Sequence, residues 1–121
     1  MPNKHIKFIE YKSKTILFTD FSKHKRDQIF IIMDEVKKIV RTKPEKSVLA
    51  LTNVFETEYD KDVIKTMHEF VSHNEPYVKA SALIGLNSYY QIIFKGILTL
   101  TGREINTFDD EQEALEWLVK Q

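Results

Sequence analysis

Short apolar runs alternate with longer amphipathic segments along this chain of 121 residues. Residues 5–11 and 15–19 carry apolar side chains on either side of a lysine-rich turn, and this pattern predicts an antiparallel hairpin. Residues 47–51 and 78–85 are mostly apolar and predict a buried strand and the central strand of a sheet. Residues 104–108 predict one further short strand.

Between these strands, apolar residues recur at intervals of three and four, which is the spacing of one helix face. Pro44 ends the first such segment. Pro76 ends the second, because the residue before a proline is pushed out of the α region. Ser88 and Asp110 open capping-box patterns at the start of the last two segments. The predicted helices cover residues 22–43, 60–73, 88–101 and a final segment that begins at Asp110.

The predicted order of elements is therefore ββαβαβαβα, in a single domain over residues 1–121. Strands separated by helices imply right-handed crossovers, parallel pairing and helices on both faces of the sheet. The hairpin at the start adds an antiparallel pair, so the sheet is mixed. We expect an α/β fold with about five strands and about four flanking helices.

The composition narrows the class of protein. The chain has no cysteine, which excludes disulfides, thiolate nucleophiles and cysteine-based zinc sites. The first residues, MPNKHIKF, contain no apolar core of a secretion signal. The apolar stretches fall short of the roughly 20 residues that a membrane helix needs. We therefore expect a cytoplasmic protein with no integral membrane segment.

The net charge of zero conceals a split between the two parts of the chain. Residues 1–46 contain 12 Lys and Arg against 6 Asp and Glu, whereas residues 47–121 contain 6 against 12. This asymmetry favours self-association or an anionic partner on one face. The alternative is that both parts fold together and their charges interleave on one surface.

No catalytic or metal-binding motif is present. His68 and His73 are five residues apart, which places them about 140° apart around a helix, whereas a zinc-binding helix needs histidines four apart. His5 and His24 have no catalytic partner near them in sequence. The turn at Gly85 could cradle an anion, as any helix N-terminus can, but a GxGxxG pattern and a Walker lysine are lacking. We expect no enzymatic activity, no cofactor and no metal.

Aromatic and basic residues occur together in the third predicted helix and the strand before it, a combination that can bind nucleic acid. These residues are Lys79, Tyr89, Tyr90, Phe94 and Lys95. The helix is apolar nearly all round, however, and the net charge is zero. Core packing is the better interpretation, and we expect no nucleic-acid partner.

The same helix carries more apolar surface than one face can bury. Its second face needs cover from another helix of the chain, a second copy, another protein or an apolar ligand. Three aromatic residues of this helix and two from the loop over residues 51–59 are the candidates for lining a ligand pocket or an interface. They are Phe55, Tyr59, Tyr89, Tyr90 and Phe94.

Two segments near the C-terminus resemble a known family. They are VKASALIGLNSYYQIIFKGILTL (78–100) and REINTFDDEQEALEWL (103–118). In the second segment, Phe108 ends a strand, two aspartates follow, and the helix sequence EALEWL comes next. These segments resemble the closing strand–helix–strand–helix of SpoIIAA-like proteins, part of the STAS/Sec14-like group. The order of elements over the whole chain is compatible with one STAS-like domain.

The resemblance implies a mixed sheet flanked by helices, no catalysis of its own and a regulatory role. Several related STAS domains bind a kinase-like anti-sigma partner and are switched by phosphorylation of a Ser or Thr after the third strand. The matching positions here are Thr52, Asn53 and Thr57, although the Asp-Ser-Ser-Gly signature of the family is absent. A hydroxyl near a helix N-terminus is a plausible phosphoacceptor, because the helix dipole stabilises the added charge. Threonine at a helix cap is equally an ordinary structural choice.

The leading functional hypothesis is a non-enzymatic regulatory or protein-interaction module of the anti-sigma-factor-antagonist type. Its partner is another protein or a second copy of the chain. The alternative is a small carrier or sensor domain that binds an apolar or amphiphilic ligand.

Overall fold

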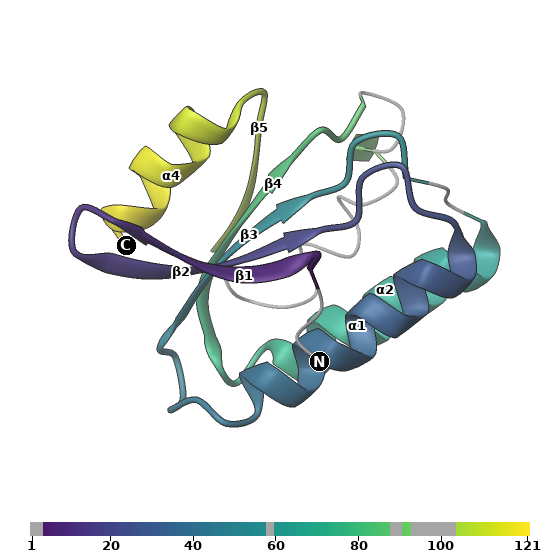
Figure 1. Ribbon diagram of the computed structural model, residues 1–121, viewed down its shortest axis with the longest axis horizontal. Helices are drawn as coiled ribbons and strands as arrows, with labels where there is room; N and C mark the ends of the chain where they lie inside the picture. Colours follow the sequence, from purple (N-terminus) through teal and green to yellow (C-terminus); the bar gives the residue numbers. More distant parts are fainter. Residues whose placement is uncertain (1–3, 58–59, 88–90, 93–103) are drawn as a thin grey trace.

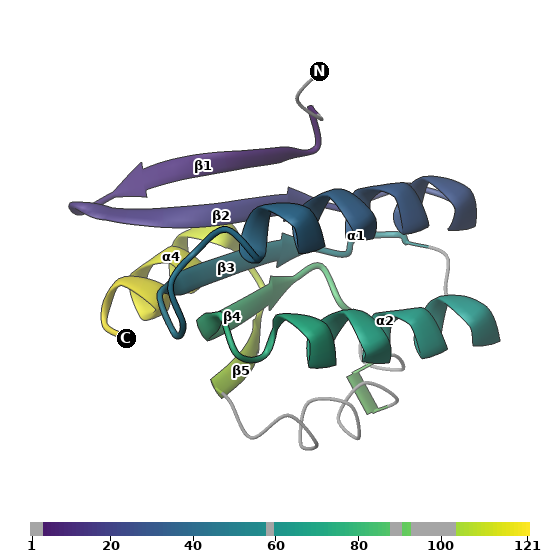
Figure 2. The same ribbon diagram turned by 90° about the horizontal axis from the view of Figure 1, so that it is seen from below.

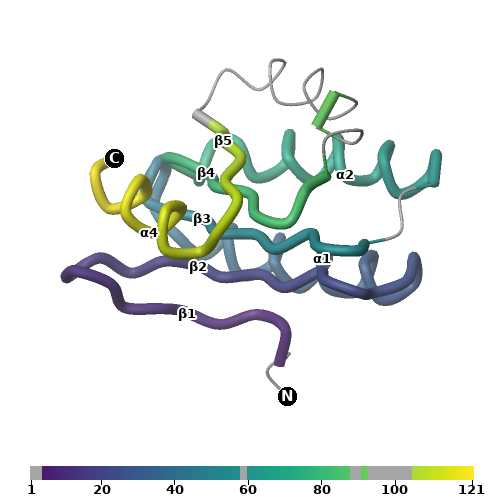
Figure 3. The backbone as a smooth tube through the Cα atoms, turned by 90° about the horizontal axis from the view of Figure 1, so that it is seen from above, coloured from purple at the N-terminus to yellow at the C-terminus, as the bar shows by residue number. Residues whose placement is uncertain are grey.

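A mixed β-sheet forms the centre of the molecule (Figure 1). The computed structural model describes residues 4–57, 60–87, 91–92 and 104–121. The five strands lie side by side in their order along the chain (Figure 3): β1 (Ile6–Tyr11), β2 (Lys14–Asp20), β3 (Val48–Asn53), β4 (Val78–Ile84) and β5 (Glu104–Phe108). β1 and β2 pair antiparallel, and all other neighbours pair parallel. The mixed sheet predicted from the sequence is confirmed.

A two-residue turn joins β1 to β2. Lys12 and Ser13 both have positive φ angles, 48° and 68°, and Tyr11 pairs with Lys14 across the strands. Two consecutive positive φ angles give the turn type whose twist matches that of a β-hairpin. The hairpin therefore forms without a glycine in its turn.

Helices cover both faces of the sheet (Figure 2). The described residues form α1 (Arg26–Val40) and α2 (Lys61–Asn74) on one face and α4 (Glu111–Val119) on the other. α1 and α2 share a face because β2, β3 and β4 follow one another across the sheet, and right-handed crossovers in one direction place their helices on one side. The helix predicted over residues 88–101 lies, except for Gln91 and Ile92, outside the described residues.

Aspartates cap the N-termini of two of the helices, and the capping-box pattern at Asp110 predicts the second of these caps. The Asp60 carboxylate accepts a 2.8 Å hydrogen bond from Val63 N, and the Asp110 carboxylate accepts one of 2.8 Å from Glu113 N. Each bond satisfies a backbone N–H that would otherwise lack a partner in the first turn. The N-terminal ends of α2 and α4 are therefore set by their own sequence.

The first helix begins at Arg26, four residues later than the pattern from residue 22 predicts. Lys23 has a φ of 58°, outside the helical region, and its N–H donates to the Phe55 carbonyl at 2.9 Å. This hydrogen bond to a loop distant in sequence holds Lys23 outside the helix, although the apolar spacing predicts a helix there. The hydrogen bond therefore joins the segment that follows β2 to the segment that follows β3.

Two apolar cores lie on opposite faces of the sheet. The larger core is formed with α1 and α2, and the smaller one with α4. Under α4, the side chains of Ala80 and Ala82 are almost completely buried, at 1% and 0% exposure. None of the helices in the described part of the chain is long and apolar enough to cross a membrane.

Candidate functional site

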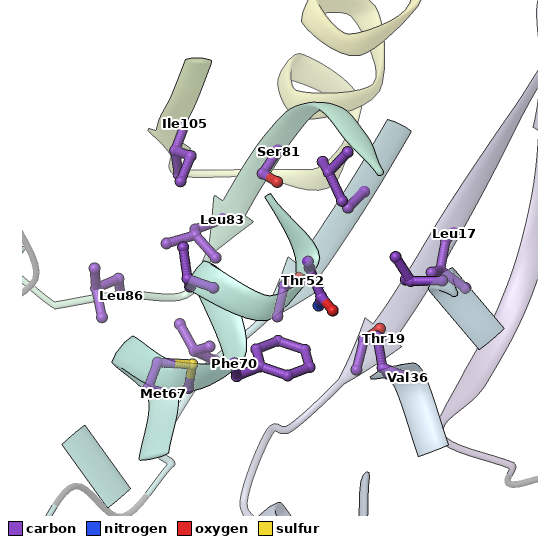
Figure 4. A pocket seen from close by; sticks show the side chains of 16 residues that line it. Leu17, Thr19, Val36, Thr52, Met67, Phe70, Ser81, Leu83, Leu86 and Ile105 are labelled. Carbon is purple, nitrogen blue, oxygen red and sulfur yellow. The ribbon is translucent and has the colours of Figure 1, made fainter. Parts of the chain in front are cut away.

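A cavity lies between the sheet and the pair of helices α1 and α2 (Figure 4). Its volume is about 60 Å³. At roughly 30 Å³ of liquid volume for each water molecule, this is room for about two water molecules. Most of the described side chains around it are apolar, and none of them is charged.

The floor of the cavity is a row of register partners on four parallel strands: Leu17, Ala50, Ser81 and Ile105. The two central members, Ala50 and Ser81, have short side chains, whereas both outer members are large. The short side chains of Ala50 and Ser81 therefore leave space above the centre of the row. Figure 4 shows Ser81 on β4 and Ile105 on β5, with Leu17 on the far side of the cavity.

A second row of register partners continues this floor toward the carboxyl ends of the strands. It consists of Thr19, Thr52 and Leu83. Thr19 is buried, with 3% of its surface exposed, and Thr52 is half-buried. The threonine side chains are short, so this part of the floor also leaves space below the helices.

The roof of the cavity comes from α1 and α2. α1 contributes Val36 and Val40, which are one helical turn apart. α2 contributes Met67, Phe70, Val71 and Asn74, at the three- and four-residue spacing of one helix face. The two valines have short side chains, so α1 contributes little bulk to the roof.

The three predicted switch residues lie at the carboxyl end of β3 and in the loop after it. Thr52 lines the cavity, while the Asn53 side chain accepts a 3.0 Å hydrogen bond from Phe55 N. The Thr57 hydroxyl is buried and donates to the Phe21 carbonyl at 3.0 Å. Thr57 thus ties the β3–α2 loop to the end of β2.

Phe55 is exposed and lies against Gly85, outside the described lining of the cavity. Its side chain is 45% exposed, and Lys23 Nζ lies 5.9 Å from the ring centre. Gly85 has a φ of 84°, and a Cβ atom built there would lie 2.7 Å from Phe55 N. The other four aromatic residues predicted to line a pocket or interface, Tyr59, Tyr89, Tyr90 and Phe94, lie outside the described residues.

His5 and His24 approach each other although they are distant in sequence. Their Nε2 atoms are 3.1 Å apart, and the rings meet edge to face. Burial, followed by the neighbouring His24, lowers the pKa of His5 below 6.5. In the described ranges, no group of three or more His, Asp or Glu side chains could hold a metal ion.

A second hollow, of about 230 Å³, lies beside the hairpin at the amino end of β3. It is more open to solvent than the cavity, and the charged Lys43 and the half-exposed Phe8 border it. Lys43 Nζ lies 4.9 Å from the centre of the Phe8 ring. The cavity under α1 and α2 is the better candidate for a binding site, because its lining is mostly apolar and comes from both the sheet and the helices.

The sequence did not reveal Ala50, Ser81 and Asn74 as residues of a site. The feature of the sequence that could have revealed the floor is the short side chain of Ala50 in β3 and of Ser81 in β4. Asn74 looked only like the polar end of a helix, yet it is 4% exposed and lines the cavity.

Comparison with known proteins supports the architecture. No family model matches the sequence, and no curated protein does. A solved structure of an uncharacterized DUF3478-family protein with a SpoIIAA-like fold from Shewanella loihica PV-4 is similar, with a TM-score of 0.75 and 16% identity over 98% of both chains. The chain has the SpoIIAA-like fold.

A second solved structure with this SpoIIAA-like architecture is an anti-sigma-factor antagonist (STAS) domain protein from Planctomyces limnophilus. It has a TM-score of 0.62 and 12% identity, and the match covers 94% of this chain and 97% of that one. At these identities the likeness concerns the fold alone. The SpoIIAA-like resemblance expected from the C-terminal segments is confirmed.

Proposed function

We propose that this protein is a non-enzymatic binding module that takes a small, mainly apolar molecule into the cavity between the sheet and helices α1 and α2. The observation that carries this proposal is the floor row in which Ala50 and Ser81 stand side by side beneath the two helices. Their short side chains leave an apolar space between the sheet and the two helices.

The energetics of packing support this proposal. Protein interiors are normally close-packed, with few voids larger than a water molecule. A cavity in an apolar core costs roughly 20–30 cal/mol for each Å³ that the surrounding side chains fail to fill. An apolar guest restores the missing contacts, and apolar cavities accordingly take up small apolar molecules. Loss of stability at one place in a well-packed fold is typical of a functional site.

Titration with dissolved xenon, a small apolar guest, followed by NMR, tests the proposal. We expect saturable shifts of the methyl signals of Leu17, Leu83 and Ile105, which line the cavity. The Ala50→Leu variant should lose them because the added side chain fills the space. Absence of shifts up to the solubility of xenon, or equal shifts in Ala50→Leu, would contradict the proposal.

A second candidate function is regulation through a protein partner. It is supported by the SpoIIAA-like fold and by the hydrogen bond that joins Thr57 to the Phe21 carbonyl. A phosphate carries about two negative charges and cannot remain buried beside a carbonyl oxygen. Phosphorylation of Thr57 would therefore break this bond and separate the two loops, which would alter the surface around the exposed Phe55.

Incubation of the protein with cell extract and ATP, followed by mass spectrometry, tests this switch. We expect phosphate on Thr57 or Thr52 and none on the corresponding valine variant. Phosphate on neither residue would overturn the switch, while xenon binding would be unaffected.

The protein partner can be a second copy of the chain. Ile92 is 77% exposed, and Ile31 on α1 is 60% exposed. Exposed isoleucines favour association through apolar contacts. Light scattering should detect a dimer at micromolar concentration and a monomer for the Ile92→Glu variant. A monomeric wild type would remove the dimer from the proposal.

A further inference from the structure

The hollow beside the hairpin is separate from the cavity of the proposed function. α1 packs over the middle of the sheet, and the edge strand β1 extends beyond it (Figure 2). Phe8 on β1 is accordingly 48% exposed and borders the hollow. The volume of the hollow, about 230 Å³, lies just below the range of roughly 300–1,000 Å³ that is usual for drug-sized ligands. The hollow therefore suits a smaller molecule with a single ring.

One wall of the hollow is apolar. It is formed by Leu17, Val48 and Leu49, all buried, and Phe8 stands beside them. Aromatic rings favour the edge-to-face or offset contacts that Phe8 can offer to a ring placed here. Val48 and Leu49 do not line the cavity under α1 and α2, so their signals report on the hollow alone.

The polar groups of the hollow leave one donor for a ligand. Thr15 Oγ1 donates to the Glu10 carboxylate at 2.5 Å, and Ser47 Oγ donates to the Pro44 carbonyl at 2.7 Å. A hydroxyl has one proton, so neither residue has a further proton to donate. Lys43 is the only charged residue among the described residues that line the hollow, and its ammonium carries three protons.

Lys43 has no counter-charge in the described part of the chain. No carboxylate there forms an ion pair with it, whereas Lys46 pairs with Glu75 at 2.9 Å. The Lys43 ammonium lies 4.9 Å from the centre of the Phe8 ring. This cation–π contact holds the ammonium beside the hollow but leaves its charge in place. Charge complementarity therefore favours an anionic group next to Lys43.

We propose that the hollow is a second binding site, for a small aromatic carboxylate. Its carboxylate pairs with the Lys43 ammonium, and its ring packs against Phe8 and the apolar wall. This inference goes beyond the proposed function, because both the place and the class of ligand differ. It also gives a role to the basic excess of residues 1–46, 12 Lys and Arg against 6 Asp and Glu, which favours an anionic partner on one face.

Benzoate and benzamide have nearly the same shape and differ in charge, so they separate charge recognition from ring packing. NMR titration of the full chain with sodium benzoate should shift the signals of Val48 and Leu49 saturably, and benzamide should bind more weakly. Lys43→Gln should weaken benzoate about threefold to tenfold, between the effects of an exposed ion pair and of a buried charged hydrogen bond. Lys79→Gln is the matched control and should bind benzoate like the wild type, because Lys79 is exposed on β4 and does not line the hollow.

A measurement on the wild type covers the case in which Lys43→Gln does not fold. Salt screens exposed charges, so NaCl at about 0.5 M should weaken benzoate and leave benzamide nearly unchanged. Benzamide binding as tight as that of benzoate, or equal losses in Lys43→Gln and Lys79→Gln, would overturn the role of Lys43. Benzoate without effect on Val48 and Leu49 would overturn the site itself. Xenon binding in the cavity is a separate result, so the proposed function and this inference can fail independently.

Discussion

Ala50 and Ser81 are direct register partners on the parallel strands β3 and β4, and both side chains line the same cavity. On the opposite face of β4, Ala80 and Ala82 are equally small, but α4 packs onto them and leaves them almost completely buried. On one face, α4 packs closely onto the small residues of the sheet. On the other face, the small residues line a cavity. This difference between the two faces is the physical basis of the candidate site.

Ala50→Leu should stabilise the protein. The added side chain fills empty apolar space, and cavity-filling substitutions commonly add about 0.5–2 kcal/mol to the free energy of unfolding. Ala82→Leu is the matched control on the close-packed face, where overpacking costs about 1–3 kcal/mol. Urea unfolding measures both variants. A loss of stability in Ala50→Leu as large as that in Ala82→Leu would show that no usable space exists above Ala50.

Gly85→Ala should destabilise the protein by at least about 2 kcal/mol. A left-handed conformation costs a residue with a Cβ atom roughly 1–2 kcal/mol, and here the Cβ would also lie 2.7 Å from both N and Cβ of Phe55. Phe55→Ala should not rescue the variant, because the atoms that clash remain in alanine. Thermal unfolding of the single and double variants measures the effect.

Glu56→Gly provides the control for the backbone conformation alone. Glu56 has a φ of 50° and is exposed. Glycine relieves the strain there, so stability should be unchanged or rise by up to about 1 kcal/mol. Equal stability of Gly85→Ala and the wild type would refute the close approach of Phe55 to Gly85.

The tip of the hairpin is attached to α4 through Glu116. The Tyr11 hydroxyl donates to one carboxylate oxygen at 2.5 Å, and Lys12 Nζ donates to the other at 2.8 Å. The Lys12 bond and then the Tyr11 bond lower the pKa of Glu116 below 4.5, and the bond to Glu116 raises the pKa of Tyr11 above 10.0.

A carboxyl group with a lowered pKa in the folded state stabilises the protein above its ordinary pKa and loses this effect as the pH falls through the lowered value. Glu116→Ala should therefore be less stable than the wild type at pH 7, and the difference should shrink below pH 4.5. The NMR titration of Tyr11 should move down toward 10.0 in the variant. An unchanged Tyr11 titration would mean that the hydrogen bond does not form in solution.

The His5–His24 pair should make the protein less stable in mild acid. A 3.1 Å contact between two Nε2 atoms needs one neutral ring to accept the hydrogen bond, so it cannot persist when both rings are protonated. Burial, His24 and Lys4 lower the pKa of His5, and Asp20 raises it by less. Because the folded state disfavours protonated His5, stability should fall as the pH drops below 6.5 and level off below the lowered pKa.

Denaturant unfolding between pH 7.5 and 5 checks this dependence. His5→Gln should show a flatter profile than the wild type, whereas His68→Gln, on α2, should retain the full pH dependence. Parallel profiles for the wild type and His5→Gln would contradict the role of the pair.

The local pattern of the sequence was sufficient to predict the five strands and the helices α1, α2 and α4 of the described residues, apart from the start of α1. Apolar spacing and capping residues such as Asp110 act over a few neighbouring positions, so they can be recognised in the sequence alone. The start of α1 could not be predicted, because Lys23 adopts its left-handed conformation in contact with the distant Phe55 carbonyl.

The cavity could not be predicted for a related reason. It depends on the register that places Ala50 beside Ser81 and on helices whose side chains stop short of both, and neither is encoded within a few residues. Asn74 is polar and ends a helix, which is an ordinary pattern on a surface. Only the packing of α2 on the sheet reveals that it is buried.

Diffraction from crystals pressurised with xenon tests the central claim most directly, because xenon enters apolar cavities without needing a specific ligand. We predict one xenon site between Ala50 and Ser81 on the floor and Phe70 on the roof, and its loss in Ala50→Leu crystals. An interior without xenon there, with Phe70 or Met67 packed directly onto Ala50 and Ser81, would contradict the account.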